Sequence, residues 1–368
     1  MRIRFVGTLL VALFLAGTAI AASYDEAIAK ARTILETRIE EGYPGISVAV
    51  GVGGEIVFAE AVGYADVDSK AAMTPKTKLR IGSVSKPVTA AGLMLLVESE
   101  RLDLDVPVQT YVPSFPEKEH SFTVHQLAGH TAGIRHYKGI ESYSKKHYPT
   151  VLEGLVIFED DPLEFEPGTQ YRYSSYGYNL ISAAMELPAG KDFLTYMQEV
   201  VFDPLEMNDT IADWANREIP NRTTFYVGAG ENPRVAPMVD NSYKWAGGGF
   251  LSTPSDLVRF GSAHLKQGLL AQESLDTVFT SQTLDNGEET GYGIGWSIQP
   301  PPNDKALLLW QHGGSSVGGK ASLMVVPDVG VVVAMLANVS NHPDIGQDNA
   351  DIAGAFAEAV MAERVAVP

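Results

Sequence analysis

The segments of this sequence that favour β-strands lie near its two ends, and a long stretch that favours helices separates them. Near the start, residues 45–50 and 55–59 are rich in strand-forming residues and flank a glycine-rich turn at 51–54, which predicts a hairpin. Extended patterns return only late in the chain, at 293–298, 306–310, 322–327 and 331–337. Strands at both ends with helices between them predict one sheet that is built from both termini and carries an inserted helical subdomain.

Helical patterns set the expected organisation of the chain. Helices are predicted at 23–41, 83–102 and 349–365. We expect one domain of the α/β (α+β) class over residues 22–368. Its α/β lobe takes about 22–82 and 286–368, and its mostly helical lobe takes about 83–285. The cleft between two such lobes is a natural place for a binding site.

The first residues have the pattern of an export signal. Arg2 and Arg4 give a positive start, an apolar run covers 5–20, and Ala19-Ile20-Ala21 has the small side chains that a signal peptidase requires. The apolar run is short for a membrane-spanning helix. We therefore expect residues 1–21 to be a bacterial signal peptide and the mature protein to be secreted or periplasmic. An uncleaved N-terminal anchor is the alternative.

Composition excludes several classes of site and partner. The sequence has no cysteine, so disulfides, zinc–thiolate sites and cysteine nucleophiles are excluded. Its formal net charge is −18, and such an acidic surface repels nucleic acid and anionic membranes. We expect neither as a partner, beyond the contact of the signal segment with a membrane. The charge does not identify the substrate.

The sharpest local signal is the segment Ile81-Gly82-Ser83-Val84-Ser85-Lys86-Pro87. A serine and a lysine three residues apart on a helix lie on one face. In a helix, the ring of Pro87 would meet the carbonyl of Ser83, which places Ser83 at or near the helix start. Exposed N–H groups and the helix dipole favour a developing oxyanion there. A partly buried Lys86 would have a pKa below its usual value of about 10.4 and could accept the serine proton.

Three other patterns suggest chemistry but have simpler explanations. The Ser-x-x-Lys spacing occurs again at Ser142 and Lys145, in a polar stretch that we interpret as a solvated loop or helix face. Residues 314–318 match the G-x-S-x-G of α/β-hydrolases, but a strand is expected to follow them where that motif needs a helix. Several histidines lack the spacing and partners of a metal site, and we interpret them as ordinary hydrogen-bonded side chains: His120, His125, His130 and His136.

Two distant motifs strengthen the Ser83 signal. Ser83-x-x-Lys86, Tyr173-Ser174-Ser175 and His312-Gly313-Gly314, in this order, resemble the three motifs of serine β-lactamases and penicillin-binding proteins. The pattern is similar to that of class C enzymes, D-Ala-D-Ala carboxypeptidases and related esterases. Further segments resemble a mitochondrial branch of this superfamily in animals: 102–113, 133–137 and 239–250. The resemblance covers roughly 45–338 and implies a β-lactamase-like fold, with an antiparallel sheet flanked by helices.

The resemblance implies a role for each motif. Ser83 is then the nucleophile with Lys86 beside it, and Tyr173 is a second basic group, its phenolate favoured by the lysine, that relays protons to or from Ser83. The backbone N–H groups of Ser83 and Ser315 form the oxyanion hole, which needs the glycines for close approach. The remaining motif residues are expected to bind substrate: Ser175, His312, Gly313 and Gly314. No metal and no cofactor is needed.

Departures from the family pattern bear on the substrate. Many relatives have asparagine at the position of Ser175, and lysine and a hydroxyl residue at those of His312 and Gly313, where they help to hold the carboxylate of a penicillin. A mostly neutral imidazole and a missing hydroxyl weaken that grip. We therefore expect an acyl-enzyme hydrolase of amide or ester carbonyls that acts on a small molecule, peptide or ester. The alternatives are a true β-lactamase or D-Ala-D-Ala carboxypeptidase, and a catalytically idle relative that binds or forms filaments; a homo-oligomer is compatible with each.

Overall fold

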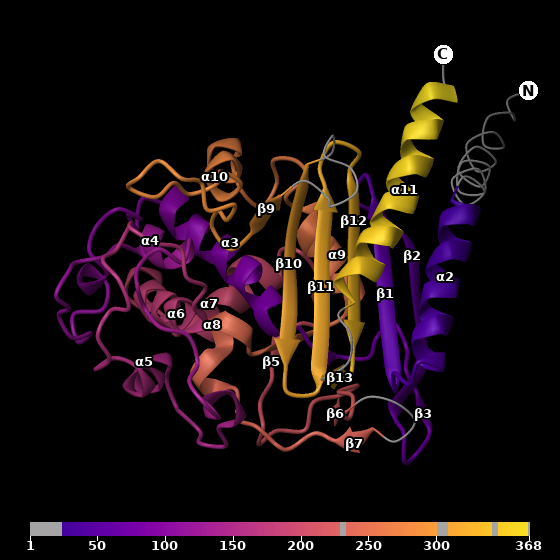
Figure 1. Ribbon diagram of the computed structural model, residues 1–368, viewed down its shortest axis with the longest axis horizontal. Helices are drawn as coiled ribbons and strands as arrows, with labels where there is room; N and C mark the ends of the chain where they lie inside the picture. Colours follow the sequence, from indigo (N-terminus) through magenta and orange to yellow (C-terminus); the bar gives the residue numbers. More distant parts are fainter. Residues whose placement is uncertain (1–23, 229–232, 300–307, 341–344, 367–368) are drawn as a thin grey trace, which may run out of the picture.

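The two ends of the chain meet in one antiparallel sheet (Figure 1). The structure, a computed structural model, describes residues 24–228, 233–299, 308–340 and 345–366. In this part of the chain, seven strands follow one another in the order β3-β2-β1-β12-β11-β10-β9. Their bounds are Gly45–Val52 (β1), Glu55–Asp66 (β2), Ala71–Ala72 (β3), Ser297–Gln299 (β9), Leu309–Ser316 (β10), Gly319–Val326 (β11) and Val331–Ala337 (β12). Val48 of β1 lies opposite Met335 of β12, so the predicted sheet built from both termini is confirmed.

Helices cover both faces of this sheet (Figure 1). On one face pack α2 (Asp25–Glu40) and α11 (Gly346–Ala366), and on the other packs α9 (Pro254–Ser262). Successive side chains of a strand point to opposite faces. Val333 of β12 accordingly joins the apolar cluster under α2 and α11, whereas its neighbour Ala334 joins the cluster that extends into the helical part. Every residue of β12 is buried for this reason.

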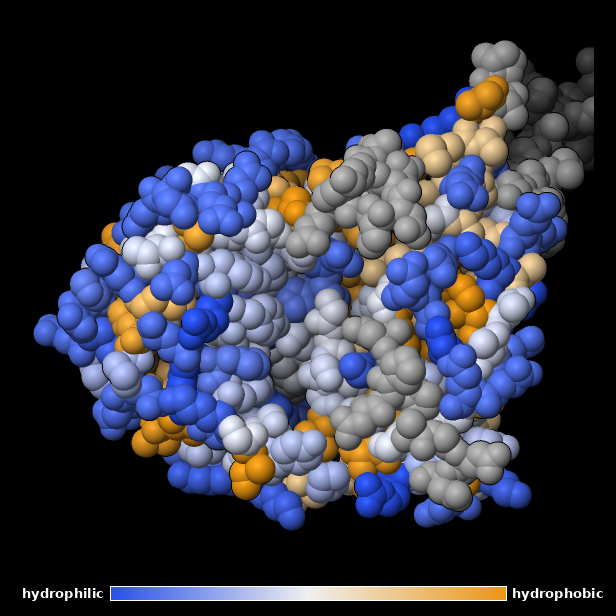
Figure 2. All heavy atoms as spheres, viewed as in Figure 1, coloured by the Kyte–Doolittle hydropathy of each residue, from blue (hydrophilic) through white to orange (hydrophobic). Residues whose placement is uncertain are grey.

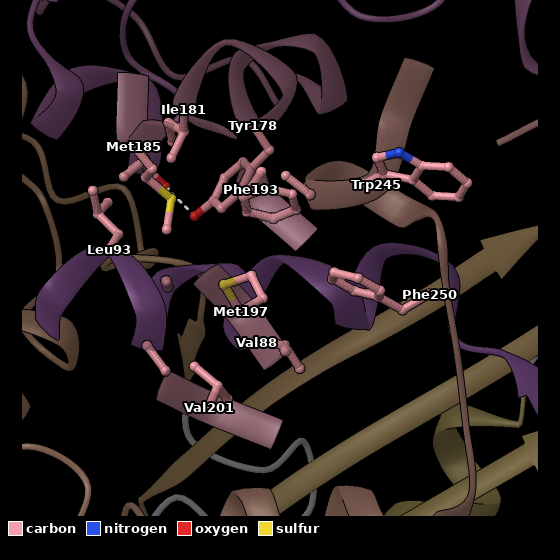
Figure 3. Close-up of a cluster of buried hydrophobic side chains, with 14 of the residues drawn as sticks. Val88, Leu93, Tyr178, Ile181, Met185, Phe193, Met197, Val201, Trp245 and Phe250 are labelled. Atoms are coloured by element: carbon pink, nitrogen blue, oxygen red, sulfur yellow. Dashed lines mark hydrogen bonds between the residues drawn. The ribbon is translucent and has the colours of Figure 1, made fainter. Parts of the chain in front are cut away.

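The helical part is centred on α3 (Ser85–Glu98), which is buried on almost all sides. A helix that is apolar all round packs inside a core. Figure 3 shows Leu93 of α3 beside Met185 of α6 (Ser175–Ala189), in a cluster that also contains Met197 of α7 (Phe193–Met197). A Cβ at Gly92 would lie 2.6 Å from the Met197 sulfur, so the two helices approach closely where α3 has only a hydrogen for a side chain.

Short elements complete the described part of the chain. The other α-helices are α4 (Val124–Ala128), α5 (Val151–Gly154), α8 (Trp245–Gly248) and α10 (Gln272–Val278). The other strands are β4 (Leu79–Arg80), β5 (Ile211–Ala212), β6 (Tyr226–Val227), β7 (Arg234–Val235), β8 (Phe250–Ser252) and β13 (Val339–Ser340). Short 3-10 helices occur at η1 (Gly82–Val84), η2 (Val108–Thr110), η3 (Glu141–Tyr143), η4 (Leu155–Ile157) and η6 (Ser242–Lys244), and η5 (Gln198–Phe202) is a short π-helix.

Several expected boundaries differ from the structure. The strand predicted at 293–298 begins only at Ser297, because Gly295 has a φ of +82° and packs against the backbone of α3. The first long helix of the helical part ends at Glu98, before Glu100 with its φ of +56°. The helix α9 falls within the range expected for the helical lobe, yet it packs on the sheet.

The expected signal peptide, residues 1–21, lies outside the described residues, and so do residues 306–307 of a predicted strand. None of the helices that the structure describes is long and apolar enough to cross a membrane.

Candidate active site

Ser83 lies at the start of the central helix of the helical part. It belongs to η1, which leads directly into α3. Pro87 is in the first turn of α3, where a missing N–H removes no helical hydrogen bond. The side chain of Ser83 is partly exposed, while its neighbours Gly82 and Val84 are buried. The structure therefore gives Ser83 the position at the helix start that its sequence predicts.

Lys86 lies beside Ser83 and has no exposed surface. Its Nζ is 3.1 Å from Ser83 Oγ, 2.9 Å from Ser175 Oγ and 2.7 Å from the carbonyl oxygen of Gly247. Burial lowers the pKa of the Lys86 amine well below its usual range, and the second lysine Lys244 lowers it further by charge repulsion. The amine thus has three polar neighbours and a weakened hold on its proton.

Tyr173 faces this lysine from a distant part of the chain. Lys86 Nζ lies 4.7 Å from the centroid of the Tyr173 ring. The Tyr173 hydroxyl is buried and has no hydrogen-bond partner among the described residues, although Ser83 and Ser175 are near enough to lower its pKa. Burial outweighs this effect and raises the pKa of the phenol. The expected phenolate is therefore disfavoured, because the buried site penalises the anion more than its neighbours stabilise it.

Two histidines hold the Tyr173-Ser174-Ser175 segment in place. His130 Nδ1 accepts a hydrogen bond from the Ser174 N–H at 3.2 Å, and His136 Nδ1 accepts one from the Ser175 N–H at 3.0 Å. Burial lowers the pKa of His136 to about 4, so its ring is neutral near pH 7 and its proton is on Nε2. Both are hydrogen-bonded, as expected of ordinary histidines, but nothing in their spacing indicates that they flank this motif.

Strand β10 approaches Ser83 from the other side. Gly82 has a φ of +50°, and a Cβ there would lie 2.8 Å from the Ser315 nitrogen. A Cβ at Gly314 would lie 2.0 Å from the carbonyl oxygen of Ile81. The backbones of η1 and β10 therefore touch, which only glycine permits at these two positions. This contact brings the segments of Ser83 and Ser315 together, as an oxyanion hole built from both would require.

We expect Gly314→Ala to lower the free energy of unfolding by about 1–3 kcal/mol, because the added methyl group overlaps the Ile81 carbonyl and must push β10 away. Gly313→Ala is the matched control, since a Cβ there meets no atom within 4 Å. Urea denaturation of both variants measures the difference. Equal stabilities of the two variants would contradict the close packing of β10 on η1.

These residues surround a pocket of about 450 Å³. Figure 2 shows the face hollowed near its centre, between the helical part and the sheet. The pocket is lined by most of the predicted residues: Ser83, Tyr173, Ser175, Gly313, Gly314 and Ser315. A larger hollow of about 650 Å³ near Asp105 and Gln282 contains none of them. In the described ranges, no cluster of histidine, aspartate and glutamate is placed to hold a metal ion.

His312 does not reach this pocket. It is 6% exposed, and its Nε2 lies 2.9 Å from the Tyr292 hydroxyl. Its Nδ1 lies 2.6 Å from the carbonyl oxygen of Gly313, so Nδ1 carries the proton and Nε2 accepts from Tyr292. Burial lowers the pKa of the imidazole to about 3. His312, which is expected to bind substrate, is thus buried beside the pocket and is not among the residues that line it.

Lys244 and Gly247 belong to the site although neither is part of the three motifs. Lys244 ends η6 and lines the pocket, and the Gly247 carbonyl in α8 accepts from Lys86. Both fall in the segment 239–250, which carries part of the family resemblance. That resemblance is the one signal that could have identified them.

Comparisons with known proteins agree with this geometry. The family model for Beta-lactamase matches residues 25–357. The mouse "Serine beta-lactamase-like protein LACTB, mitochondrial" is 31% identical over 434 residues, covering 87% of this chain and 79% of that protein. Penicillin-binding protein 4* of Bacillus subtilis is 28% identical and covers 77% of this chain and 66% of its own length. The octameric penicillin-binding protein homologue from Pyrococcus abyssi is 26% identical with a TM-score of 0.76, covering 91% of this chain and 77% of that one.

The expected location needs correction. A secreted or periplasmic protein is contradicted by the relatives, since the mouse protein that matches most of this chain is mitochondrial. The export pattern rests on a short apolar run after two arginines, which is a weak local signal.

Three independent observations agree on the family. The family model covers nearly the whole described chain, a relative above 30% identity spans most of it, and the fold matches a penicillin-binding protein homologue. The resemblance drawn from the three motifs is thus confirmed, and the chain belongs to the Beta-lactamase family.

Proposed function

We propose that this chain is a serine hydrolase that forms a covalent acyl-enzyme on Ser83 and acts on amide or ester carbonyls of peptides or esters. The observation that carries the proposal is the 3.1 Å contact between Lys86 Nζ and Ser83 Oγ, made by a lysine with no exposed surface. A serine gains reactivity when a base of lowered pKa lies within hydrogen-bond reach. Membership of the Beta-lactamase family supports a serine hydrolase in general.

Lys86 is the base of the acylation step. A neutral amine has two N–H groups and one lone pair. Its N–H groups suit the two nearer acceptors, the Gly247 carbonyl at 2.7 Å and Ser175 Oγ at 2.9 Å. The lone pair is then directed to the Ser83 hydroxyl. As Ser83 Oγ bonds to the substrate carbonyl carbon, its proton passes to Nζ, and the carbonyl oxygen becomes an oxyanion that the N–H groups of Ser83 and Ser315 stabilise.

Tyr173 is the proton donor to the leaving group. Burial raises the pKa of its phenol, so it enters the reaction protonated. When the tetrahedral intermediate collapses, the bond to the leaving oxygen or nitrogen breaks and that atom takes the phenol proton. The Lys86 ammonium then returns a proton to Tyr173. Hydrolysis of the acyl-enzyme runs through the same groups, with water as the nucleophile and Ser83 as the leaving hydroxyl.

Peptide or ester substrates are favoured over penicillins. The β10 position at which many relatives have a lysine is taken here by His312, which is neutral and bonded to Tyr292. A penicillin carboxylate therefore finds no cation on that strand at His312.

Intact-mass measurement of the acyl-enzyme tests the proposal. The protein is mixed with a p-nitrophenyl ester or with penicillin, quenched in acid within milliseconds to seconds, and digested to locate the adduct. We expect an added mass equal to one acyl group, located on Ser83, with the ester. An adduct on another residue, or turnover of the ester in a protein that lacks Ser83 Oγ, would remove the proposal. A penicillin adduct that is then released by water would favour the β-lactamase alternative.

A further inference from the structure

Lys244 is a buried cation in the wall of the active-site pocket. It is the last residue of η6 and is only 4% exposed, yet it lines the pocket that contains Ser83. Its Nζ lies 5.6 Å from the centroid of the Tyr137 ring and 5.3 Å from that of the Tyr243 ring. Aromatic rings stabilise an ammonium group only in part.

This cation has no counter-ion of its own. In the described part of the chain, Lys244 Nζ makes no hydrogen bond and no carboxylate lies within ion-pair distance. The carboxylate that acts on it most, Asp213, is already held by Arg80 at 2.6 Å and by Arg222 at 2.8 Å. Asn241 also donates to Asp213, at 2.7 Å. The protein around Lys244 therefore has more positive than negative charge.

The lining of the whole pocket also has more positive than negative side chains. Among the described residues that line it there is no aspartate and no glutamate, although the chain has a net charge of −18. Lys320 is a second lysine of the lining and lies opposite Ser315 in the register of β10 and β11. An acidic protein with an acid-free, lysine-lined pocket attracts anions to that pocket.

Burial lowers the pKa of Lys244 to about 7, and Arg80 adds to this effect while Asp213 opposes it. A buried charge without a partner is costly, and an anion that arrives beside it offsets the cost. A structural lysine would be expected to have a protein carboxylate as its partner. The open side of Lys244 is the pocket, where a substrate group can supply the negative charge.

We propose that Lys244 binds a carboxylate of the substrate, so that the hydrolase prefers esters or amides that carry an anionic group. This inference rests on the proposed acyl-enzyme function and adds to it a substrate class and a specificity residue. The cation belongs to the η6 wall of the pocket, a different element from the strand β10 on which His312 lies.

Matched substrates that differ only in charge test the proposal. One pair places the charge on the acyl side: the p-nitrophenyl esters of glutaric acid and of its monoamide. The other pair places it on the leaving side: 3-carboxyphenyl acetate and 3-carbamoylphenyl acetate. We expect the carboxylate to be preferred in kcat/KM by about 10- to 100-fold in one of the pairs, through KM. Lys244→Met should remove this preference even if the loss of its repulsion on Lys86 changes the rates with both esters alike, whereas Lys244→Arg should retain it.

Lys76→Met controls for the change in net charge, because Lys76 is exposed and away from the pocket. No preference in either pair, or a preference that survives in Lys244→Met, overturns the inference. An unchanged ratio of kcat/KM between the charged and the neutral ester in Lys244→Met, with both values lowered equally, would mean that Lys244 acts only by adjusting Lys86.

A binding measurement separates this inference from the proposed function. Calorimetric titration of Ser83→Ala with each intact ester needs no turnover, and we expect tighter binding of the carboxylate, lost when Lys244→Met is added. Tighter binding of the carboxylate without any Ser83-dependent hydrolysis would contradict the proposed function but support carboxylate binding by Lys244. Ser83-dependent hydrolysis without any charge preference would support the proposed function but contradict carboxylate binding by Lys244.

Discussion

Replacing Ser83 with alanine should lower kcat/KM for a p-nitrophenyl ester by about 10³-fold or more, because no other group can form the acyl-enzyme. The fold should survive, since Lys86 keeps its contacts with Ser175 and Gly247 at 2.9 and 2.7 Å. Steady-state kinetics measures the loss, and thermal unfolding of the same preparation shows whether the variant is folded. A folded Ser83→Ala enzyme that keeps its activity would contradict the assignment.

Ser142→Ala is the matched control for this experiment. Ser142 has the same spacing to Lys145 as Ser83 has to Lys86, and it lines the same pocket. No hydrogen bond joins Ser142 to Lys145 in the described residues, and Lys145 is exposed. We therefore expect Ser142→Ala to keep its ester hydrolysis. If Ser142→Ala were the inactive variant, the second motif would be the functional one.

The local part of the site follows from the sequence because helix geometry fixes it. Residues three apart on a helix share a face, and a proline in the first turn defines where the helix begins. These two rules place Ser83 and Lys86 together without any knowledge of the rest of the chain. The sheet is predictable for a related reason, since strand-forming segments at both ends leave few ways to bury them.

The distant parts of the site depend on packing that spacing does not encode. The role of Tyr173 in the site is predicted only by its match to the family motif. His312 follows directly after the predicted strand at 306–310. Successive side chains of a strand point to opposite faces, and the sequence does not show which of the two faces borders the pocket. In β10, His312 and Gly314 are buried whereas Gly313 and Ser315 are exposed, and the imidazole packs behind the pocket lining, against Tyr173 and Tyr292.

Buried charge is the hardest feature to foresee. Lys244 is within a polar-looking stretch, Asp240-Asn241-Ser242-Tyr243-Lys244, which has no local sign of burial. It is nevertheless only 4% exposed, because η6 packs against α5, α6 and α8. The helix α8 in turn packs against η1. The same packing buries Lys86 and creates the repulsion between the two lysines. The chemistry of the site thus arises from tertiary contacts more than from its motifs.

Replacing Lys86 with methionine should lower kcat/KM by about 10²- to 10⁴-fold, the usual effect of losing a general base. Methionine fills a similar volume in the buried site but cannot accept the Ser83 proton. Intact-mass experiments with an activated ester measure the acylation step directly. In the wild type, acylation should become faster as the pH rises through the lowered pKa of Lys86, because only the neutral amine is a base. The methionine variant should lack this limb of the pH profile.

Lys86→Arg distinguishes a base from a positioning group. An arginine can donate hydrogen bonds to Ser175 and Gly247 but stays protonated at any working pH. If Lys86 is the base, the arginine variant should be as inactive as the methionine variant. Substantial activity in Lys86→Arg would mean that the lysine acts by donating hydrogen bonds and that another group removes the Ser83 proton.

The stability of the same variants reports the lowered pKa independently of catalysis. Burial disfavours the charged amine, so folded Lys86 holds its proton less tightly than the unfolded chain does. Between the two pKa values the unfolded state binds one more proton, and stability therefore increases with pH. Relative to Lys86→Met, the wild-type free energy of unfolding should rise by up to about 1.4 kcal/mol per pH unit, until the pH reaches the unfolded value of about 10.4. Urea denaturation of both proteins from pH 6 upward measures this difference. A difference that stays constant with pH would mean that Lys86 keeps its ordinary pKa, and the amine could then not serve as the base near pH 7.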